Sequence, residues 1–432
     1  MEYFVVLPHQ LFEKKYLDKK YTYIIWEHPH YFTGYKYNQK RIILHRGSMK
    51  YYEDYLTKSG FKTKYYSYKQ SLPKTIKSYH FFDPIDKIKM PKNGTMLESP
   101  NFILDKEIYA KYRKKTQSVI FNNFYMWSKK EVKIIPKIKS QDKYNRKKIP
   151  SGTKIPEIPD NKEDSKYIKL GINYAKRNFA KNYGNTNNFI FPLTHKTAKK
   201  WLDNFIKHKI KNFGNYQDSI VKDEQFLFHS VLSSSINIGL LNPSDIIKAI
   251  MKNKSKIPLN SLEGYIRQLF WREYQRYCYI YVNFKGNYFG NKKKLTRNWY
   301  TASTGIEPVD DCVKNAFDTG YLHHIERLMI IGNYMNLSEI SPKEGYKWFM
   351  EFSCDSYDWV MSQNVLDMVF FVTGGVTMRR PYVSSSNYII KMSNYKKGEW
   401  SDIWDELYRK FMKRNKKKLW KFRYYFPGLK KL

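Results

Sequence analysis

The amino-acid sequence predicts an α/β domain with a parallel sheet, followed by a larger domain built of helices. Short apolar runs and helical stretches alternate over residues 1–80, which is typical of a parallel sheet with crossover helices. After residue 167 the strand patterns nearly disappear and apolar residues recur at helical spacing. We therefore expect an α/β domain over residues 1–133, a linker over 134–166 and a helical domain over 167–432.

The elements of the first domain follow from local patterns. Apolar runs at 4–7, 23–26 and 42–45 predict three strands, and the aromatic run 61–68 predicts another. Residues 48–59 predict a helix that ends at Gly60, because glycine suits the position after a helix C-terminus. More helix is expected at 100–130. Residues 134–166 are rich in Pro, Lys and Ser and predict an exposed connector.

Start signals place helices in the second domain. Apolar residues recur at helical spacing over 194–210. Asn260 with Glu263 forms a capping-box pattern, and Ser341 with Glu344 forms another that has Pro342 at the first helical position. A last helix, opened by Ser401, is expected to present the stripe Trp404, Leu407, Tyr408 and Phe411.

The charge balance favours a polyanionic partner. Lys and Arg number 78 against 39 acids, a net charge of +39, and 18% of the residues are aromatic. Such a surface attracts nucleic acid. The alternative is an AT-rich genome, since the excess is mostly Lys and accompanies abundant Asn and Tyr.

Other classes are disfavoured. No stretch reaches the roughly 18 apolar residues of a membrane span, and the start of the chain shows no secretory signal, so we expect an intracellular protein that is not secreted. The three cysteines are scattered, which argues against a disulfide framework and against a zinc or iron–sulfur site held by cysteines alone.

Four segments carry candidate chemistry, each with an ordinary alternative. Hydroxyls in 228–239 suit phosphate binding or simple helix capping. Glu263, Arg267 and Trp271 share a helix face, as a pocket wall or as a surface ion pair beside a packed indole. His323 lies one turn from Arg327, and a histidine there suits a general acid or a hydrogen-bonded core position. Acids, amides and a Trp in 355–364 suit a polar ring cofactor or a helix end.

Taken in order, seven stretches resemble the photolyase/cryptochrome superfamily, most closely its branch of bacterial and archaeal (6-4) photolyase-related proteins. The resemblance implies a Rossmann-like α/β domain and an all-α FAD-binding domain, and residues 44–56 resemble the family's antenna-like domain. The seven stretches are 191–206, 213–220, 226–243, 263–274, 320–334, 355–368 and 380–395.

The resemblance also implies roles for individual residues. The FAD phosphates would be lined by the segment that contains Ser230, Leu232, Ser233, Ser234 and Ser235. The wall of the flavin and substrate pocket would comprise Glu263, Arg267, Trp271 and Arg272, and the flavin ring or its ribose would lie near Asp355, Trp359 and Asn364. Trp359 is the expected flavin-proximal electron donor. His324, with His323 beside it, would donate a proton to the lesion, and the expected DNA contacts are Arg272, Arg327, Arg379 and Arg380.

Two departures from the family pattern matter. The positions that match the family's four iron–sulfur cysteines are Pro308, Lys396, Glu399 and Asp402, and Cys312 lies one helical turn out of register, so we expect no cluster. Ser234 and Ser235 stand where the family usually has Pro and another residue. The resemblance places the branch's lumazine antenna on no particular residue, so its presence stays open.

Three functions remain. The first is light-driven repair of (6-4) photoproducts in UV-damaged DNA whose lesion is flipped out, by a monomer without a membrane partner. The second is a cryptochrome-like photoreceptor. The third is a degenerate photolyase that acts as a non-enzymatic nucleic-acid-binding or structural protein. In the basic tail 413–432 we expect the aromatic side chains to pack and some lysines to contact phosphate. A flavin cavity is expected between Ser230 and Asn364, with His324 facing its mouth.

Overall fold

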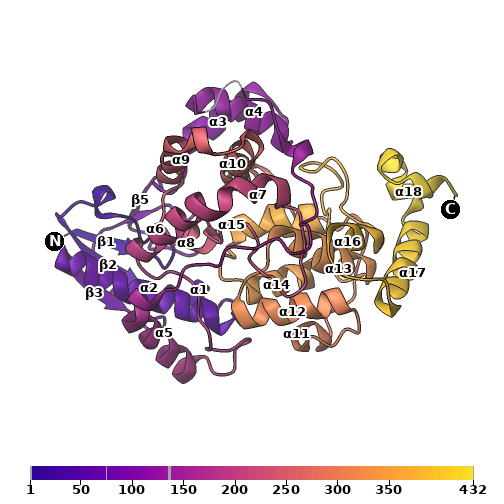
Figure 1. Ribbon diagram of the computed structural model, residues 1–432. Coiled ribbons are helices and arrows are strands. Elements are labelled where there is room, and N and C mark those ends of the chain that lie inside the picture. The colour runs from indigo at the N-terminus through magenta and orange to yellow at the C-terminus, as the bar shows by residue number, and fades with distance from the viewer. Residues whose placement is uncertain (1, 74, 135–137, 432) are drawn as a thin grey trace.

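A five-stranded parallel sheet forms the N-terminal part of the protein. The structure is a computed structural model that describes residues 2–73, 75–134 and 138–431. The strands follow the order β3-β2-β1-β4-β5, and every pair is parallel. They are β1 (Glu2–Val6), β2 (Tyr21–Trp26), β3 (Lys62–Tyr66), β4 (Tyr79–Phe82) and β5 (Gly94–Leu97). Strand β2 is buried along its whole length, as expected where both faces of a sheet are covered. The predicted fold class is confirmed, because helices make up most of the remainder (Figure 1).

The predicted strand at 42–45 is wrong, since these residues lie inside helix α2 (Gln39–Lys58). Asn38 caps this helix by accepting a hydrogen bond from the Lys40 N–H. Helix α2 packs against β3 on one side and α5 (Ser165–Asn178) on another, so its middle is buried nearly all round. A helix buried in this way loses its amphipathic period, which is why a short apolar run resembled a strand.

Glycines mark two features of α2. Gly60, just beyond the helix, has φ +79°, a conformation that glycine adopts without strain. Gly171 of α5 faces α2 so closely that a Cβ there would lie 2.8 Å from the Ile43 carbonyl oxygen. The close contact between the two helices therefore requires a residue without a side chain.

The remaining helices build the larger part of the molecule around α10, which packs against α4, α7 and α15. The helices before α10 are α1 (Pro29–Thr33), α3 (Lys106–Lys115), α4 (Phe121–Val132), α6 (His195–Asn204), α7 (Ile210–Tyr216), α8 (Ser233–Asn237) and α9 (Pro243–Lys252). From there on they are α10 (Leu259–Tyr281), α11 (Asn298–Thr301), α12 (Glu307–Thr319), α13 (Asn333–Leu337), α14 (Pro342–Phe352), α15 (Asp358–Met361), α16 (Asn387–Met392), α17 (Glu399–Arg414) and α18 (Lys416–Leu419).

Shorter helical turns complete the chain. The π-helical segments are Phe205–Lys209, Glu326–Gly332 and Ser362–Val369. The 3-10 turns are Lys14–Tyr16, Asp142–Tyr144, Lys162–Asp164, Lys254–Lys256, Trp420–Tyr425 and Pro427–Lys431. Among the described residues, no helix is both long and apolar enough to cross a membrane.

Helix starts agree with the sequence signals in part. The Ser341 hydroxyl caps α14 by accepting from the Glu344 N–H, as predicted. The capping box at Asn260 is wrong, because α10 begins at Leu259 and the Glu263 side chain serves other partners. Helix α17 also begins two residues before Ser401, after Gly398. The Asn260 side chain contacts the distant residues Asn145 and Asn215, whereas the Ser401 hydroxyl bonds to Gly398 and so caps the helix from its third residue.

The described part of the predicted linker, residues 134 and 138–166, is held against the helical part of the chain, and residues 135–137 lie outside the described residues. It runs from α4, at the top of Figure 1, to α5 at the lower left. Asn145 is fully buried and donates to the Asn260 carbonyl, and the buried Asp164 carboxylate accepts from the Leu193 N–H and the Thr194 hydroxyl. These buried hydrogen bonds explain how a segment with few apolar residues is held in one conformation. The division into three parts stays a prediction.

Candidate functional site

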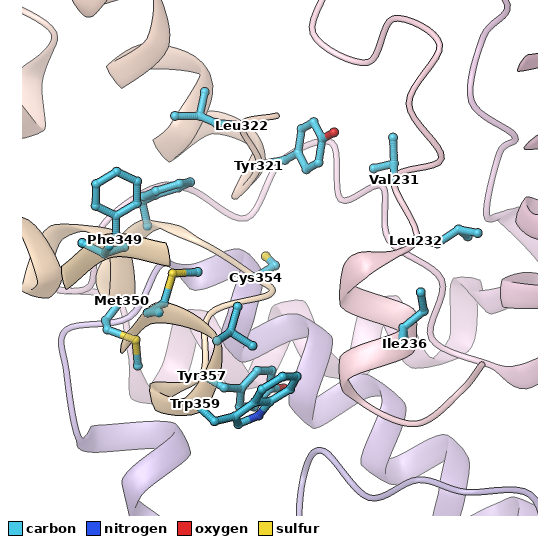
Figure 2. Close-up of a cluster of buried hydrophobic side chains, with 14 of the residues drawn as sticks. Val231, Leu232, Ile236, Tyr321, Leu322, Phe349, Met350, Cys354, Tyr357 and Trp359 are labelled. Atoms are coloured by element: carbon cyan, nitrogen blue, oxygen red, sulfur yellow. The ribbon is translucent and has the colours of Figure 1, made fainter. Parts of the chain in front are cut away.

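Four segments that are far apart in the sequence meet around α8 and α10. The Asn237 side chain donates to the Asp355 carbonyl at 3.0 Å and accepts from the Arg272 Nε at 3.0 Å. The Tyr265 hydroxyl lies 3.2 Å from the Ser230 Oγ. In Figure 2, Val231, Leu232 and Ile236 lie on one side of this region and Met350, Tyr357 and Trp359 on the other. The predicted site segments are therefore brought together.

The serine segment contributes unsatisfied hydroxyls. Ser234 and Ser235 are 1% and 0% exposed, and neither Oγ has a hydrogen-bond partner within the described part of the chain. A buried hydroxyl without a partner costs about 1–3 kcal/mol. Ser233 interacts with the Asp355 carboxylate instead, and Leu232 contributes only apolar contact in the core. The two free hydroxyls fit a ligand rich in hydrogen-bonding groups, such as FAD.

A buried ion pair joins two of the predicted site residues. Arg327 Nη1 and Nη2 lie 3.0 and 3.3 Å from the two Asp355 carboxylate oxygens, and Arg327 Nε donates to the Leu322 carbonyl. Burial raises the pKa of Asp355, but the Arg327 charge and hydrogen bonds from Ser353 and Ser233 outweigh it and hold the pKa below its usual value. Because the Arg327 guanidinium is committed to this pair, the prediction that it contacts DNA does not fit the structure.

Arg272 and Trp359 lie in the interior, beside the loops that follow β4 and β5. Arg272 is 9% exposed, donates to the Asn101 carbonyl at 2.7 Å, and lies over the rings of Phe102 and Trp359. The Trp359 backbone N–H donates to the Asp86 carboxylate at 2.9 Å. The predicted DNA contact for Arg272 is wrong, since a buried guanidinium that already donates to protein acceptors cannot reach phosphate. Trp359 is 2% exposed, as an internal electron donor requires.

Glu263, Arg267 and Trp271 share a face of α10 as predicted, but each contacts a different neighbour. The buried Glu263 carboxylate accepts from the Tyr125 hydroxyl and the Gln141 N–H. Arg267 pairs with Asp142 at 3.2 Å. Trp271 Nε1 donates to the Asn364 Oδ1 at 3.1 Å, which joins two of the predicted cofactor residues. The structure therefore places Glu263 and Arg267 in contacts with α4 and the linker, and Trp271 in the central site.

The two adjacent histidines have opposite environments. His323 is 2% exposed, neither ring nitrogen has a hydrogen-bond partner in the described chain, and burial lowers its pKa well below the usual value. The His324 side chain is 45% exposed, and its Nε2 lies 3.0 Å from the Asp218 Oδ1. A proton exchanged with a substrate at the surface would therefore pass through His324.

Sequence reasoning missed two residues of this cluster. His229 stacks on His323 with ring centroids 4.9 Å apart and planes 12° apart, and burial lowers its pKa well below normal. Asp218 orients His324. Both residues lie in stretches that carry the family resemblance, yet neither has a local pattern that points to the His323–His324 pair. Only the fold brings them together.

Two π-helical segments follow the site residues directly. One begins at Glu326, two residues after His324, and the other, Ser362–Val369, contains Gln363 and Asn364. The Gln363 Oε1 is buried without a partner in the described chain. Single π-helical turns occur frequently at functional sites, because they shift side chains out of the regular helical register.

Two of the cavities in the described part of the chain lie away from the predicted site. One of about 590 Å³ lies between the linker and Phe189, Asn204 and His208, and one of about 350 Å³ lies beside Phe32, Tyr68 and Phe179. Neither is lined by the segments around Ser230, His324 or Asn364, so neither is the predicted flavin cavity. The fit of FAD rests on the buried polar groups described above.

The surface residues that remain for nucleic acid lie near the C-terminus. Arg379 is exposed, and Arg380 lies over the rings of Tyr382 and Tyr425. In the tail, Phe422 and Phe426 are buried as expected, but Trp420, Tyr424 and Tyr425 are 46%, 80% and 49% exposed. The expectation that the tail aromatics pack is therefore wrong for three of them. The end of the chain lies beside α17 and α18, at the right of Figure 1.

The cysteines are separated in the fold. Cys278 lies in α10, Cys312 in α12 and Cys354 beyond α14, and each is a buried free thiol. A cluster held by four thiolates needs one cysteine more than the chain contains. The absence of an iron–sulfur cluster stays a prediction, as does the identity of any antenna pigment.

Comparisons with known proteins agree with this fold. The model of the deoxyribodipyrimidine photo-lyase-related protein family matches residues 4–90 and 75–191. A (6-4) photolyase of Agrobacterium fabrum is 36% identical over 272 residues, which are 59% of this chain and 53% of the relative. An uncharacterised protein of Acanthamoeba polyphaga mimivirus is 57% identical over 88 residues, which are 20% of this chain and 72% of that protein. The chain thus spans about half the length of the curated photolyase it matches.

Solved structures share the fold at low sequence identity. A bacterial class III photolyase from Agrobacterium tumefaciens has a TM-score of 0.53 and 15% identity, covering 96% of this chain and 87% of its own. A Synechocystis cryptochrome has a TM-score of 0.59 and 14% identity, covering 100% and 89%. The chain thus shares its architecture, a parallel α/β sheet followed by helices, with a photolyase and a cryptochrome of known structure. In sequence it is similar to the photolyase-related family over residues 4–191 and to a (6-4) photolyase over 272 residues.

Proposed function

We propose that this protein is an FAD-dependent, light-driven DNA photolyase that repairs (6-4) pyrimidine photoproducts. The observation that carries the proposal is the histidine pair. His324 is exposed and oriented by Asp218, whereas His323 is buried beside it. The proposal is also supported by the similarity to a (6-4) photolyase, which is 36% identical over 272 residues.

FAD would be held by the two serine hydroxyls that lack a partner in the described chain and by the segment 355–364. Ser234 and Ser235 would hydrogen-bond the phosphates, and Asp355, Trp359 and Asn364 would surround the ring and ribose. When bound in its reduced form, the flavin supplies the light-driven electron for repair. The Arg327–Asp355 pair holds the 355–364 segment against α8 through the Asn237 contact.

His324 would act as the proton donor. Its exposed ring can reach a base that has been flipped out of the duplex, a step that costs a few kcal/mol and less for a lesion that stacks poorly. The Asp218 carboxylate fixes the orientation of the ring by accepting a hydrogen bond from the protonated imidazole. General acid catalysis of this kind contributes a factor of about 10²–10⁴ in rate.

The test is repair of a (6-4) lesion in an oligonucleotide by the reduced protein under illumination. We expect repair by the unaltered chain, and a loss of at least about 100-fold in His324→Ala with flavin binding retained. The matched control is His208→Ala, because His208 is also exposed but lies beside the linker cavity. A flavin-loaded, reduced protein that leaves the lesion intact would refute the proposal.

The alternatives have specific support of their own. The Synechocystis cryptochrome covers the whole chain, so a photoreceptor with the same flavin would show light-dependent spectral changes that His324→Ala does not affect. The net charge of +39 and the exposed aromatics of the tail also fit a nucleic-acid-binding protein without enzymatic activity. A colourless protein that binds intact and damaged DNA equally would select that function.

A further inference from the structure

Three histidines converge at the junction of α12, the segment before α8 and the π-helical segment Glu326–Gly332. His229, His323 and His324 each place a ring nitrogen within 4.8 Å of the others. The His229 and His323 rings are stacked, and the His324 ring centroid lies 5.7 Å from that of His229. Since two of these side chains are buried, the cluster is part of the folded interior and opens to solvent at His324.

Three ring nitrogens of the two buried histidines lack hydrogen-bond partners in the described chain. His229 Nε2 and both ring nitrogens of His323 are buried with no hydrogen bond in the described chain, although the two residues are only 7% and 2% exposed. Buried polar atoms in folded proteins normally have partners, and each unsatisfied one costs about 1–3 kcal/mol. Three such atoms in one place indicate a ligand that the protein chain does not supply.

We infer that His229, His323 and His324 form a binding site for a divalent transition-metal ion, with Zn²⁺ as the preferred occupant. Neutral imidazole is the ligand type that zinc, copper and nickel share, whereas Mg²⁺ and Ca²⁺ prefer oxygen. Three histidines with one further position is a common zinc geometry. Two carboxyl groups lie close enough to fill the fourth position. Asp218 lies beside His324, and the Glu326 Oε2 lies 3.6 Å from the His323 Nε2.

The geometry requires one adjustment. Tetrahedral Zn²⁺ at about 2.05 Å from each nitrogen places its ligands about 3.3 Å apart, which is shorter than the 4.8 Å limit that describes the cluster. His324 is exposed and can move by rotating its side chain, and the nearly parallel His229 and His323 rings must turn toward a common point, because an imidazole binds a metal in its ring plane. The Lys209 ammonium lies near His229 and opposes a cation, and the Asp218 carboxylate beside His324 offsets it.

Metal binding and the proposed repair reaction would compete for His324. An ion held here would withhold the ring nitrogen that donates the proton, so Zn²⁺ is expected to inhibit repair. This consequence rests on the proposed function, but the binding itself does not. The decisive measurement is therefore made in the dark and without DNA.

The test is titration of Zn²⁺ into full-length, untagged, chelator-treated protein by calorimetry. We expect one site, weakened at least tenfold by His324→Ala and by His229→Gln, because loss of even an outer-sphere partner of a zinc site costs about 10–100-fold. His80→Gln is the matched control, since His80 lies on β4 of the α/β part. Circular dichroism without zinc shows whether each variant folds, and the exposed His324→Ala decides the question if His229→Gln does not. Binding that is absent, or unchanged in His324→Ala, would overturn the inference.

Discussion

Replacing Asp355 by Asn tests whether the buried ion pair holds the site together. The Arg327 and Asp355 side chains are only 16% and 13% exposed, and two hydrogen bonds of 3.0 and 3.3 Å join them. Breaking a buried pair by removing one partner costs about 3–5 kcal/mol, because the remaining charge stays buried. Asn keeps the shape and one acceptor oxygen, so we expect about 3 kcal/mol, the lower end of that range.

The pH dependence of protein stability gives a second test of the Arg327–Asp355 pair. The pKa of Asp355 in the folded protein lies below its usual value, so the stability it contributes is present above the unfolded-state pKa and is lost as the pH falls through the folded-state pKa. The difference in stability between the unaltered chain and Asp355→Asn should therefore be full at pH 7 and shrink in acid. Since only the carboxylate titrates here, the variant itself should lack this part of the acid sensitivity.

The assay is urea unfolding followed by tryptophan fluorescence, with midpoints compared at pH 7 and at acid pH. Glu406→Gln is the control, because its pair with Lys410 is exposed and exposed pairs contribute little to stability. Replacing both members, as Arg327→Met with Asp355→Leu, should cost less than the two single changes added together. If Asp355→Asn matches Glu406→Gln at pH 7, the pair is not a structural support of the site.

Four further predictions follow from the structure. Trp359→Phe should slow light-driven flavin reduction in the purified protein, whereas Trp420→Phe, at an exposed position, should not; equal rates would exclude Trp359 as the internal donor. Truncation after Asn415 should weaken DNA binding, as measured by fluorescence anisotropy over a salt series. The slope of log affinity against log salt concentration should fall in magnitude by about 0.9 for each phosphate that the shortened chain no longer binds. An unchanged slope would exclude the tail from the DNA interface. Gly171→Ala should destabilise the protein by about 1–3 kcal/mol in urea, whereas Gly428→Ala, which meets open space, should be neutral; a neutral Gly171→Ala would contradict the close contact of α2 and α5. Ser234→Ala with Ser235→Ala should lower FAD occupancy in the absorption spectrum without loss of apoprotein stability, since both hydroxyls lack protein partners in the described chain, and full occupancy would argue against a phosphate contact.

The sequence by itself determined that an α/β part precedes a helical part, and it placed the start of α14. Apolar runs such as 4–7 and 23–26 predict strands because a strand buried on both faces needs continuous apolar residues. The signal at Ser341 also holds, because an N-terminal cap depends on a hydroxyl and an N–H only three residues apart. Both signals depend only on residues that are close together in the sequence. They can therefore be read without knowing which distant residues the element will contact.

Tertiary structure decided which site residues face one another and which are committed to the interior. Arg272 and Arg327 carry the charges that a DNA contact requires, but burial against Phe102 and Asp355 removes them from the surface. The stacking of His229 on His323, 94 positions later in the sequence by the residue numbers, has no local signature. Because burial and pairing depend on residues far away in the chain, a pattern can show that a group is present and only the packed fold shows whether it is free to act.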